Sequence, residues 1–180
     1  TLERDRSRAE AIKAEREQEA QAFFREHAAE WDQIRSLHVA EAAVEAAIRE
    51  ARGPKHFGLL VDLGTGTGRM LELLADRYGR GLGIDVNHAM LSYARSRLEA
   101  ARLSSAQVRH GDIYNLAIDD GQADVVVMHQ VLHFLSEPGR ALAEAARILA
   151  PGGRLLIVDF APHGLEFLRD RFNPKLRGRS

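Results

Sequence analysis

Three glycines separated by single residues follow a short apolar run in the first half of the chain. Residues 61–68 read VDLGTGTG, which places Gly64, Gly66 and Gly68 between an apolar stretch and a helix-forming stretch. Glycine adopts backbone conformations closed to other residues and lets a ligand lie against bare backbone. In an open α/β sheet such a loop lies at the carboxyl end of a strand, where ligands bind. The motif predicts a ligand-binding loop, although three glycines can also serve only to make a tight turn.

The spacing of this loop and an acid that follows it indicate the class of ligand. A dinucleotide fingerprint requires a third glycine at the position that Arg69 occupies, which argues against NAD or FAD. Asp85 ends the next apolar run, about 20 residues after the loop. A carboxylate there can accept hydrogen bonds from both hydroxyls of a ribose, or it can cap the helix that begins near Asn87. The two roles are compatible, and we favour ribose binding.

Two histidines, His129 and His133, follow a later run of valines. An imidazole at His129 could remove a proton from a hydroxyl or amine acceptor; the interpretation we favour gives it only a backbone carbonyl contact to the ligand. Two histidines four residues apart on one helix could bind zinc. Because residues 125–127 are strand-like, His129 should precede the helix, so we expect no metal site.

Alternating strand-like and helix-like segments must position these residues. This alternation is typical of βαβ units around a parallel sheet. We predict strands over residues 58–63, 81–85, 106–110, 124–128 and 154–159, and helices over residues 69–78, 90–101 and 137–149. The expected fold class is therefore α/β, a Rossmann-like and mostly parallel sheet with flanking helices and an N-terminal helical extension.

That extension changes in character along its length. Residues 1–21 are rich in Arg, Glu, Lys and Ala, which favours a charged helix that offers little to bury. It could pair with another chain or lie in solvent. Residues 22–52 are amphipathic at helical spacing and end at Gly53-Pro54. Three aromatic residues of this part should pack between helices, and one of them could cap the ligand pocket: Phe23, Phe24 and Trp31.

Composition excludes several classes of protein. The chain has 180 residues, 45% of them hydrophobic, and a formal net charge of -1. That charge gives no reason to expect nucleic-acid binding by this chain. The absence of cysteine excludes thiolate chemistry and disulfides. No apolar stretch approaches the roughly 18 residues that cross a bilayer. We therefore expect a soluble cytoplasmic protein with no membrane partner.

The motifs together resemble those of class I S-adenosylmethionine-dependent methyltransferases. Four further segments are similar to that family's motifs: GLGID ending at Asp85, HGDI at 110–113, ADVVVMHQVLHFL at 123–135 and LAPGGRLLIVD at 149–159. The resemblance implies that S-adenosyl-L-methionine is the cofactor, with Asp112 accepting from the adenine amino group and Ile113 packing on the ring. Its expected cofactor-binding residues are Asp62, Gly64, Thr65, Gly66, Asp85, Val86, Met90, Gly111, Asp112, Ile113 and His129.

A narrower resemblance is to methyltransferase domains fused behind an ArsR-type winged-helix repressor. It rests on WDQIRSLH at 31–38 and VDFAPH at 158–163. It implies a charged connector helix over 1–21, a helical cap over 22–52, a cofactor-binding Rossmann-like domain over 53–165 and a polar tail over 166–180. The family's usual seven-stranded sheet has two strands after the fifth, and these are expected to be missing here. The last strand would then be an edge open to pairing, so a homodimer could form there or through the N-terminal helix.

The resemblance implies an enzyme that methylates a small-molecule acceptor. The alternative is a regulatory module that binds the cofactor without turnover and reports its occupancy to an attached winged-helix DNA-binding domain. Intact cofactor motifs fit both functions. The catalytic candidate is His129, since methyl transfer depends mainly on positioning and desolvation and needs a base only for some acceptors.

Overall fold

Five parallel strands form one sheet in the computed structural model, which describes residues 2–36, 42, 46, 49–50 and 56–159. The strands are β1 Phe57–Leu63, β2 Tyr78–Asp85, β3 Ala106–His110, β4 Ala123–His129 and β5 Leu149–Val158. Their order in the sheet is β3-β2-β1-β4-β5, and every neighbouring pair is parallel. The chain winds outward from β1 on one side and from β4 on the other, so the order reverses between β1 and β4. An open α/β sheet binds its ligand beside such a switch point, at the carboxyl ends of the strands.

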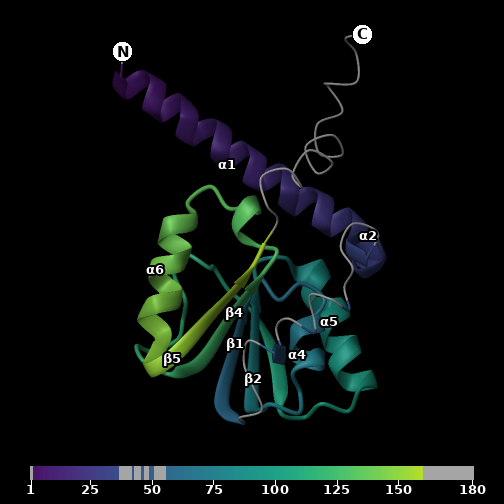
Figure 1. Ribbon diagram of the computed structural model, residues 1–180. Coiled ribbons are helices and arrows are strands. Elements are labelled where there is room, and N and C mark those ends of the chain that lie inside the picture. Colours follow the sequence, from purple (N-terminus) through teal and green to yellow (C-terminus); the bar gives the residue numbers. More distant parts are fainter. Residues whose placement is uncertain (1, 37–41, 43–45, 47–48, 51–55, 160–180) are drawn as a thin grey trace.

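Helices cover both faces of the sheet (Figure 1). The helices α4 Arg69–Leu73 and α5 His88–Ala100 pack on one face, and α6 Pro138–Ile148 packs on the other. Successive side chains of a strand point to opposite faces. Leu60 of β1 is accordingly buried with α4 and α5, whereas its neighbour Val61 is buried with α6. This confirms the predicted α/β class, and it explains why residues 125–128 of β4 form an uninterrupted apolar run.

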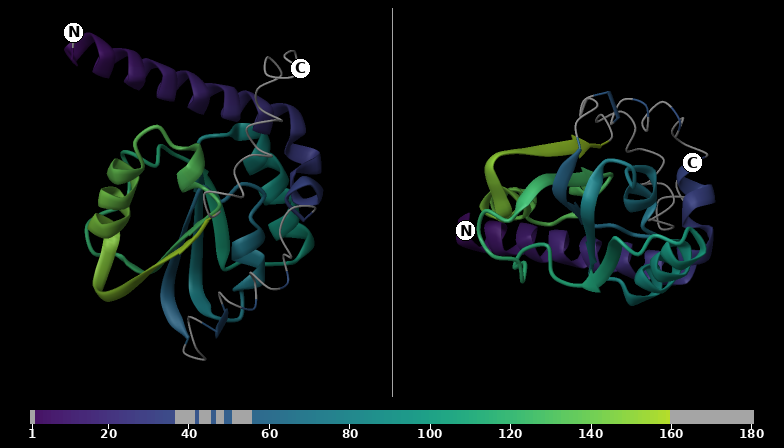
Figure 2. Two further views of the ribbon diagram at one scale, coloured as in Figure 1. Left: turned by 45° about the horizontal axis from the view of Figure 1, so that its top comes forward. Right: turned by 90° about the horizontal axis from the view of Figure 1, so that it is seen from below.

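The N-terminal extension lies across the carboxyl ends of the strands (Figure 1). It consists of α1 Leu2–His27, a short 3-10 helix Ala28–Glu30 and α2 Trp31–Ser36. The first turns of α1 project past the rest of the fold (Figure 2), and residues 2–16 are all exposed. The expectation that residues 1–21 offer little to bury therefore holds for these turns but not for Ala20, which is buried with Phe24. The expected boundary between residues 21 and 22 falls inside α1, because nothing there breaks the helix.

Three predicted boundaries were wrong. The first crossover helix ends at Leu73, not at residue 78, and β2 begins at Tyr78, not at residue 81. The ring of Tyr78 is buried and its hydroxyl donates to the Leu71 carbonyl at 2.5 Å, while its backbone pairs with Phe57. The last strand begins at Leu149 rather than at residue 154, because Leu149 already pairs with Ala123 ahead of a register shift.

Some predictions fall on residues that the structure does not describe. These are the cap positions within 37–41, 43–45, 47–48 and 51–52, and everything within 160–180, including the tail and the expected loss of two strands. Within the described residues, β5 pairs only with β4 and so forms an edge of the sheet. None of the described helices has the length and apolar character that crossing a membrane would require.

Candidate functional site

The glycine-rich loop joins β1 to α4 at the carboxyl end of the sheet. Gly64 has φ +72° and Gly66 has φ +55°, values that side chains oppose. A Cβ on Gly64 would lie 2.6 Å from Cγ2 of Val131, so only glycine fits there. A Cβ on Gly66 would meet nothing nearer than Nε1 of Trp31 at 4.0 Å. Gly64 is therefore required by packing, whereas Gly66 leaves backbone bare toward open space.

Hydrogen bonds hold the loop in place. The backbone N–H groups of Gly64 and Thr65 both donate to the Ile84 carbonyl, at 2.8 and 3.0 Å. The Thr65 hydroxyl donates to the Asp62 carboxylate at 2.7 Å. Asp62 is only 1% exposed. These hydrogen bonds fix the shape of the loop.

Asp85 links this loop to the start of α5. One carboxylate oxygen accepts from the Gly66 N–H at 2.8 Å, and the other accepts from the Asn87 N–H at 2.9 Å. Burial is the largest influence on this carboxyl and raises its pKa, although the two N–H groups act in the opposite direction. The helix cap itself is Asn87, whose side chain accepts from the Met90 N–H at 3.2 Å. Asp85 is therefore free of the capping role and keeps further acceptor capacity for a ligand.

The segment after β3 supplies another wall of the site. Gly111, Asp112 and Ile113 follow His110 directly, and the Asp112 carboxylate accepts from the Tyr114 N–H at 2.9 Å. Val86, after β2, is 47% exposed although it is apolar. Exposed apolar surface beside polar groups is suited to cover a flat ring.

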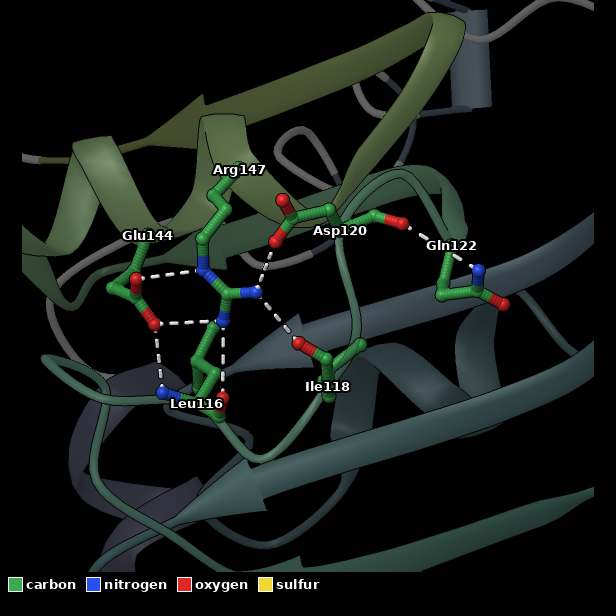
Figure 3. A network of polar contacts seen from close by, with 6 residues as sticks. All are labelled: Leu116, Ile118, Asp120, Gln122, Glu144 and Arg147. Carbon is green, nitrogen blue, oxygen red and sulfur yellow. Dashed lines mark hydrogen bonds and ion pairs between the residues drawn. The ribbon is translucent and has the colours of Figure 1, made fainter.

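A distant arginine secures the far end of the same segment (Figure 3). Arg147 of α6 donates to the carbonyls of Leu116 at 3.0 Å and Ile118 at 2.8 Å. It also forms ion pairs with Glu144 and Asp120, and Glu144 accepts from the Leu116 N–H at 2.8 Å. The loop that begins at Gly111 is thus tied to the helix behind the sheet.

The end of β4 has an unusual backbone. His129 is buried, and the next residue, Gln130, has φ +56°. The Gln130 N–H donates to the Val158 carbonyl at 2.6 Å, which holds this strained conformation against β5. His133 lies in the 3-10 helix Leu132–Phe134 and contacts the carboxylate of Asp159. His129 and His133 therefore do not share one helix face, the arrangement that the zinc hypothesis needed.

The N-terminal extension closes the site from above. Glu17 accepts from the Ser136 N–H at 2.9 Å and from the Tyr114 hydroxyl at 3.0 Å. Gln21 accepts from the Asn87 side-chain amide through its backbone carbonyl at 3.0 Å. These bonds fasten α1 to the loops after β2, β3 and β4.

A second attachment lies further along the extension. Asp32 of α2 accepts from the Thr67 hydroxyl at 2.7 Å and forms an ion pair with Arg97 of α5. The extension is thus anchored on the glycine-rich loop as well.

One cavity lies among these elements, and its free space measures about 960 Å³ when the adjoining open solvent is included. All of the residues predicted for cofactor binding line it. Reasoning from the sequence missed several lining residues: Glu17, Gln21, Arg69, Met70, Ile84, Gln130, Val131, Phe134 and Leu135. Gln130 could have been suspected from its place directly after a strand, whereas nothing local marks Glu17. Of the three aromatic candidates, Phe24 and Trp31 line the cavity.

The lining is acidic. Its described residues include the carboxylates of Glu17, Asp62, Asp85 and Asp112, but only one guanidinium, that of Arg69. That guanidinium already pairs with Glu72 at 2.9 Å. The cavity therefore favours a ligand that carries positive charge or hydrogen-bond donors.

Comparison with known proteins places these features in a family. The family model for a methyltransferase domain matches residues 61–157, more than half of the chain. The chain belongs to the methyltransferase domain family. The matched residues run from the glycine-rich loop into β5, so they include most of the cavity lining, whereas Glu17, Gln21, Phe24 and Trp31 lie outside them.

Individual relatives of this methyltransferase domain match over only part of their length. A protein of Mycolicibacterium smegmatis described as an S-adenosylmethionine-dependent methyltransferase is 31% identical, over 64% of this chain and 42% of its own. A demethylmenaquinone methyltransferase of Thermus thermophilus is 34% identical, over 67% of this chain and 53% of its own. The chain thus spans about half the length of these curated relatives.

A solved structure from Methanococcus maripaludis, described as an S-adenosyl-L-methionine-dependent methyltransferase, is 25% identical with a TM-score of 0.67. It matches 85% of this chain and 74% of its own. The Rossmann-like methyltransferase fold is therefore shared across the sheet and its helices.

Proposed function

We propose that this methyltransferase domain binds S-adenosyl-L-methionine in the described cavity and transfers its methyl group to a small-molecule acceptor. One observation carries the proposal. Asp85 bridges the Gly66 N–H and the start of α5 at the carboxyl end of β2, and the whole predicted set of cofactor-binding residues lines one cavity around it. The resemblance of the motifs predicts the set, and its members line one cavity.

The cavity fits the charge and shape of this cofactor. Open space beside Gly66 suits a ligand lying on bare backbone. We assign the ribose hydroxyls to Asp85, whose carboxylate keeps acceptor capacity, and the adenine to Asp112 and Ile113, with Val86 and Met90 packing on the ring. Asp62, Gly64 and Thr65 would shape the opposite end, near His129. The acidic lining suits a cation, since S-adenosyl-L-methionine supplies a methyl group activated by a positively charged sulfonium.

The residues of the chain would act mainly through positioning. Methyl transfer requires that the acceptor be held in line with the methyl group in a site from which water is excluded. Phe24, Trp31 and Phe134 give the cavity an apolar wall. His129 is the candidate base for an acceptor that must lose a proton, because it lies buried at the end of β4 and lines the cavity.

The connection to an ArsR-type regulator is a second candidate for the role of this chain. It is favoured by α1, whose first turns are exposed while its last turns fasten to the cavity through Glu17 and Gln21. A helix arranged in this way could transmit cofactor occupancy to a preceding domain. The segment 158–163 that suggested the link lies mostly outside the described residues. In that role the chain would bind the cofactor but show no methyl transfer.

Calorimetric titration tests the proposal. The chain should bind S-adenosylhomocysteine and S-adenosylmethionine with a stoichiometry of one and should bind NAD much more weakly. Tighter binding of NAD than of S-adenosylhomocysteine would overturn the cofactor assignment. Formation of S-adenosylhomocysteine in the presence of acceptors, measured by mass spectrometry, then separates an enzyme from a sensor.

A further inference from the structure

One carboxylate in the cavity has no part in the proposed cofactor contacts. Glu17 comes from α1, far in sequence from the family motifs, and it is half-buried. Its two neighbours are the Tyr114 hydroxyl and the Ser136 N–H, which are uncharged donors. Within the described part of the chain no lysine, arginine or histidine pairs with it. Its negative charge is thus hydrogen-bonded but not neutralised.

Aromatic rings line the cavity on the same side. Glu17, Gln21 and Phe24 are spaced by four and three residues, so they share one face of α1. The ring of Phe24 lies 4.8 Å from that of Trp31 and 4.8 Å from that of Phe134, at 83° and 82° to them. All three rings line the cavity, as Glu17 does. The aromatic cluster and the carboxylate therefore border the same cavity.

A carboxylate beside aromatic rings recognises one kind of ligand. Organic cations bind to aromatic faces, and a nearby negative charge adds to the attraction. A neutral or anionic acceptor that fills the cavity would instead leave Glu17 desolvated without a counter-charge, which is costly. The same group thus attracts cations and selects against other acceptors.

We propose that Glu17 and the rings of Phe24, Trp31 and Phe134 form a subsite for an organic cation, and that the methyl acceptor carries an ammonium group. This inference rests on the proposed function, because it concerns the acceptor of that same cavity. It names a class of acceptor and leaves open which of its atoms receives the methyl group.

Two variants separate charge from hydrogen bonding. Glu17→Gln removes the charge, yet the amide oxygen can still accept from Tyr114 and Ser136. Tyr114→Phe is the matched control, because it removes a hydrogen bond to Glu17 and keeps the charge. An effect of weakened attachment of α1 should appear in Tyr114→Phe, whereas an effect of charge should appear only in Glu17→Gln.

The test is calorimetry on protein saturated with S-adenosylhomocysteine, using choline and its neutral isostere 3,3-dimethyl-1-butanol as probes. We expect choline to bind about tenfold more tightly than the isostere. Glu17→Gln should abolish this preference and leave S-adenosylhomocysteine binding within about twofold, and Tyr114→Phe should retain it.

Equal binding of the two probes, no binding of either, or an unchanged preference in Glu17→Gln would each overturn the subsite. The subsite would also be overturned if Glu17→Gln lost affinity for S-adenosylmethionine relative to S-adenosylhomocysteine and still bound choline normally. Glu17 would then interact with the sulfonium of the cofactor and not with the acceptor. Failure of the wild-type protein to bind S-adenosylhomocysteine would overturn the proposed function itself. The first titration thus distinguishes the two failures.

Discussion

Replacing Asp85 by alanine should weaken cofactor binding, and the protein should still fold. The Asp85 carboxylate accepts hydrogen bonds from two backbone N–H groups, those of Gly66 and Asn87. Its remaining lone pairs are the acceptors that we assign to the ribose hydroxyls. A hydrogen bond to a charged group contributes about 1.5 to 3 kcal/mol. A loss of that size corresponds to a rise of about 10- to 150-fold in Kd for S-adenosylhomocysteine.

The fold of Asp85→Ala should survive because the cap of α5 belongs to Asn87 and not to Asp85. Calorimetry with S-adenosylhomocysteine measures the affinity, and urea denaturation of the ligand-free protein measures the stability. Asp76→Ala is a suitable control, because it removes a carboxylate whose side chain is 61% exposed and lies outside the cavity. Its Kd should match that of the wild type. An unchanged Kd in Asp85→Ala would refute the ribose assignment and leave Asp85 with only the role of joining the loop to α5.

Three further predictions concern stability and the walls of the site. Gly64→Ala should lower the free energy of unfolding in urea by about 1 to 3 kcal/mol, because the φ of Gly64 is +72° and an added Cβ would collide with Val131. The control Gly139→Ala lies in α6, where an added Cβ would meet no atom within 4 Å, and it should be neutral or slightly stabilising. An equal loss of stability in both variants would refute the steric argument. Arg147→Met should lower both the melting temperature and the affinity for S-adenosylhomocysteine, since it frees the carbonyls of Leu116 and Ile118; a normal affinity would show that the loop holds its shape without this anchor. Burial raises the pKa of Tyr78 to about 12 from an ordinary 10.0, so between these pH values the folded protein keeps a proton that the unfolded chain loses. The free energy of unfolding should therefore fall as the pH rises from 10 toward 12. Tyr78→Phe should make this fall less steep, and an unchanged slope would contradict the raised pKa of Tyr78.

Much of the fold could be predicted from the sequence because its signals are local. Runs of buried residues such as Val125, Val126 and Val127 indicate a strand that is covered on both faces. The glycine loop and Asp85 fall at strand ends, so the parallel sheet brings them together without further information. The wrong boundaries at Tyr78 and Leu149 arose where strand pairing overrode helix-like sequence, since Tyr78 pairs with Phe57 and Leu149 pairs with Ala123.

The contacts that α1 makes with the site could not be predicted from local sequence signals. Glu17 lies 97 residues from its partner Tyr114 and 119 residues from Ser136, and no periodicity links such distant positions. The charged composition of residues 1–21 suggested a solvated helix, and that is accurate for its first turns only. A homodimer through α1 or the β5 edge and the cytoplasmic location stay predictions.

A crystal structure of the chain with S-adenosylhomocysteine tests the central claim most directly. We predict that both ribose hydroxyls lie within hydrogen-bond distance of the Asp85 carboxylate, that the adenine lies along Asp112 and Ile113, and that the homocysteine sulfur faces the side of the cavity formed by Phe24 and Phe134. A ligand bound outside the cavity, or one inside it whose ribose makes no contact with Asp85, would contradict the account.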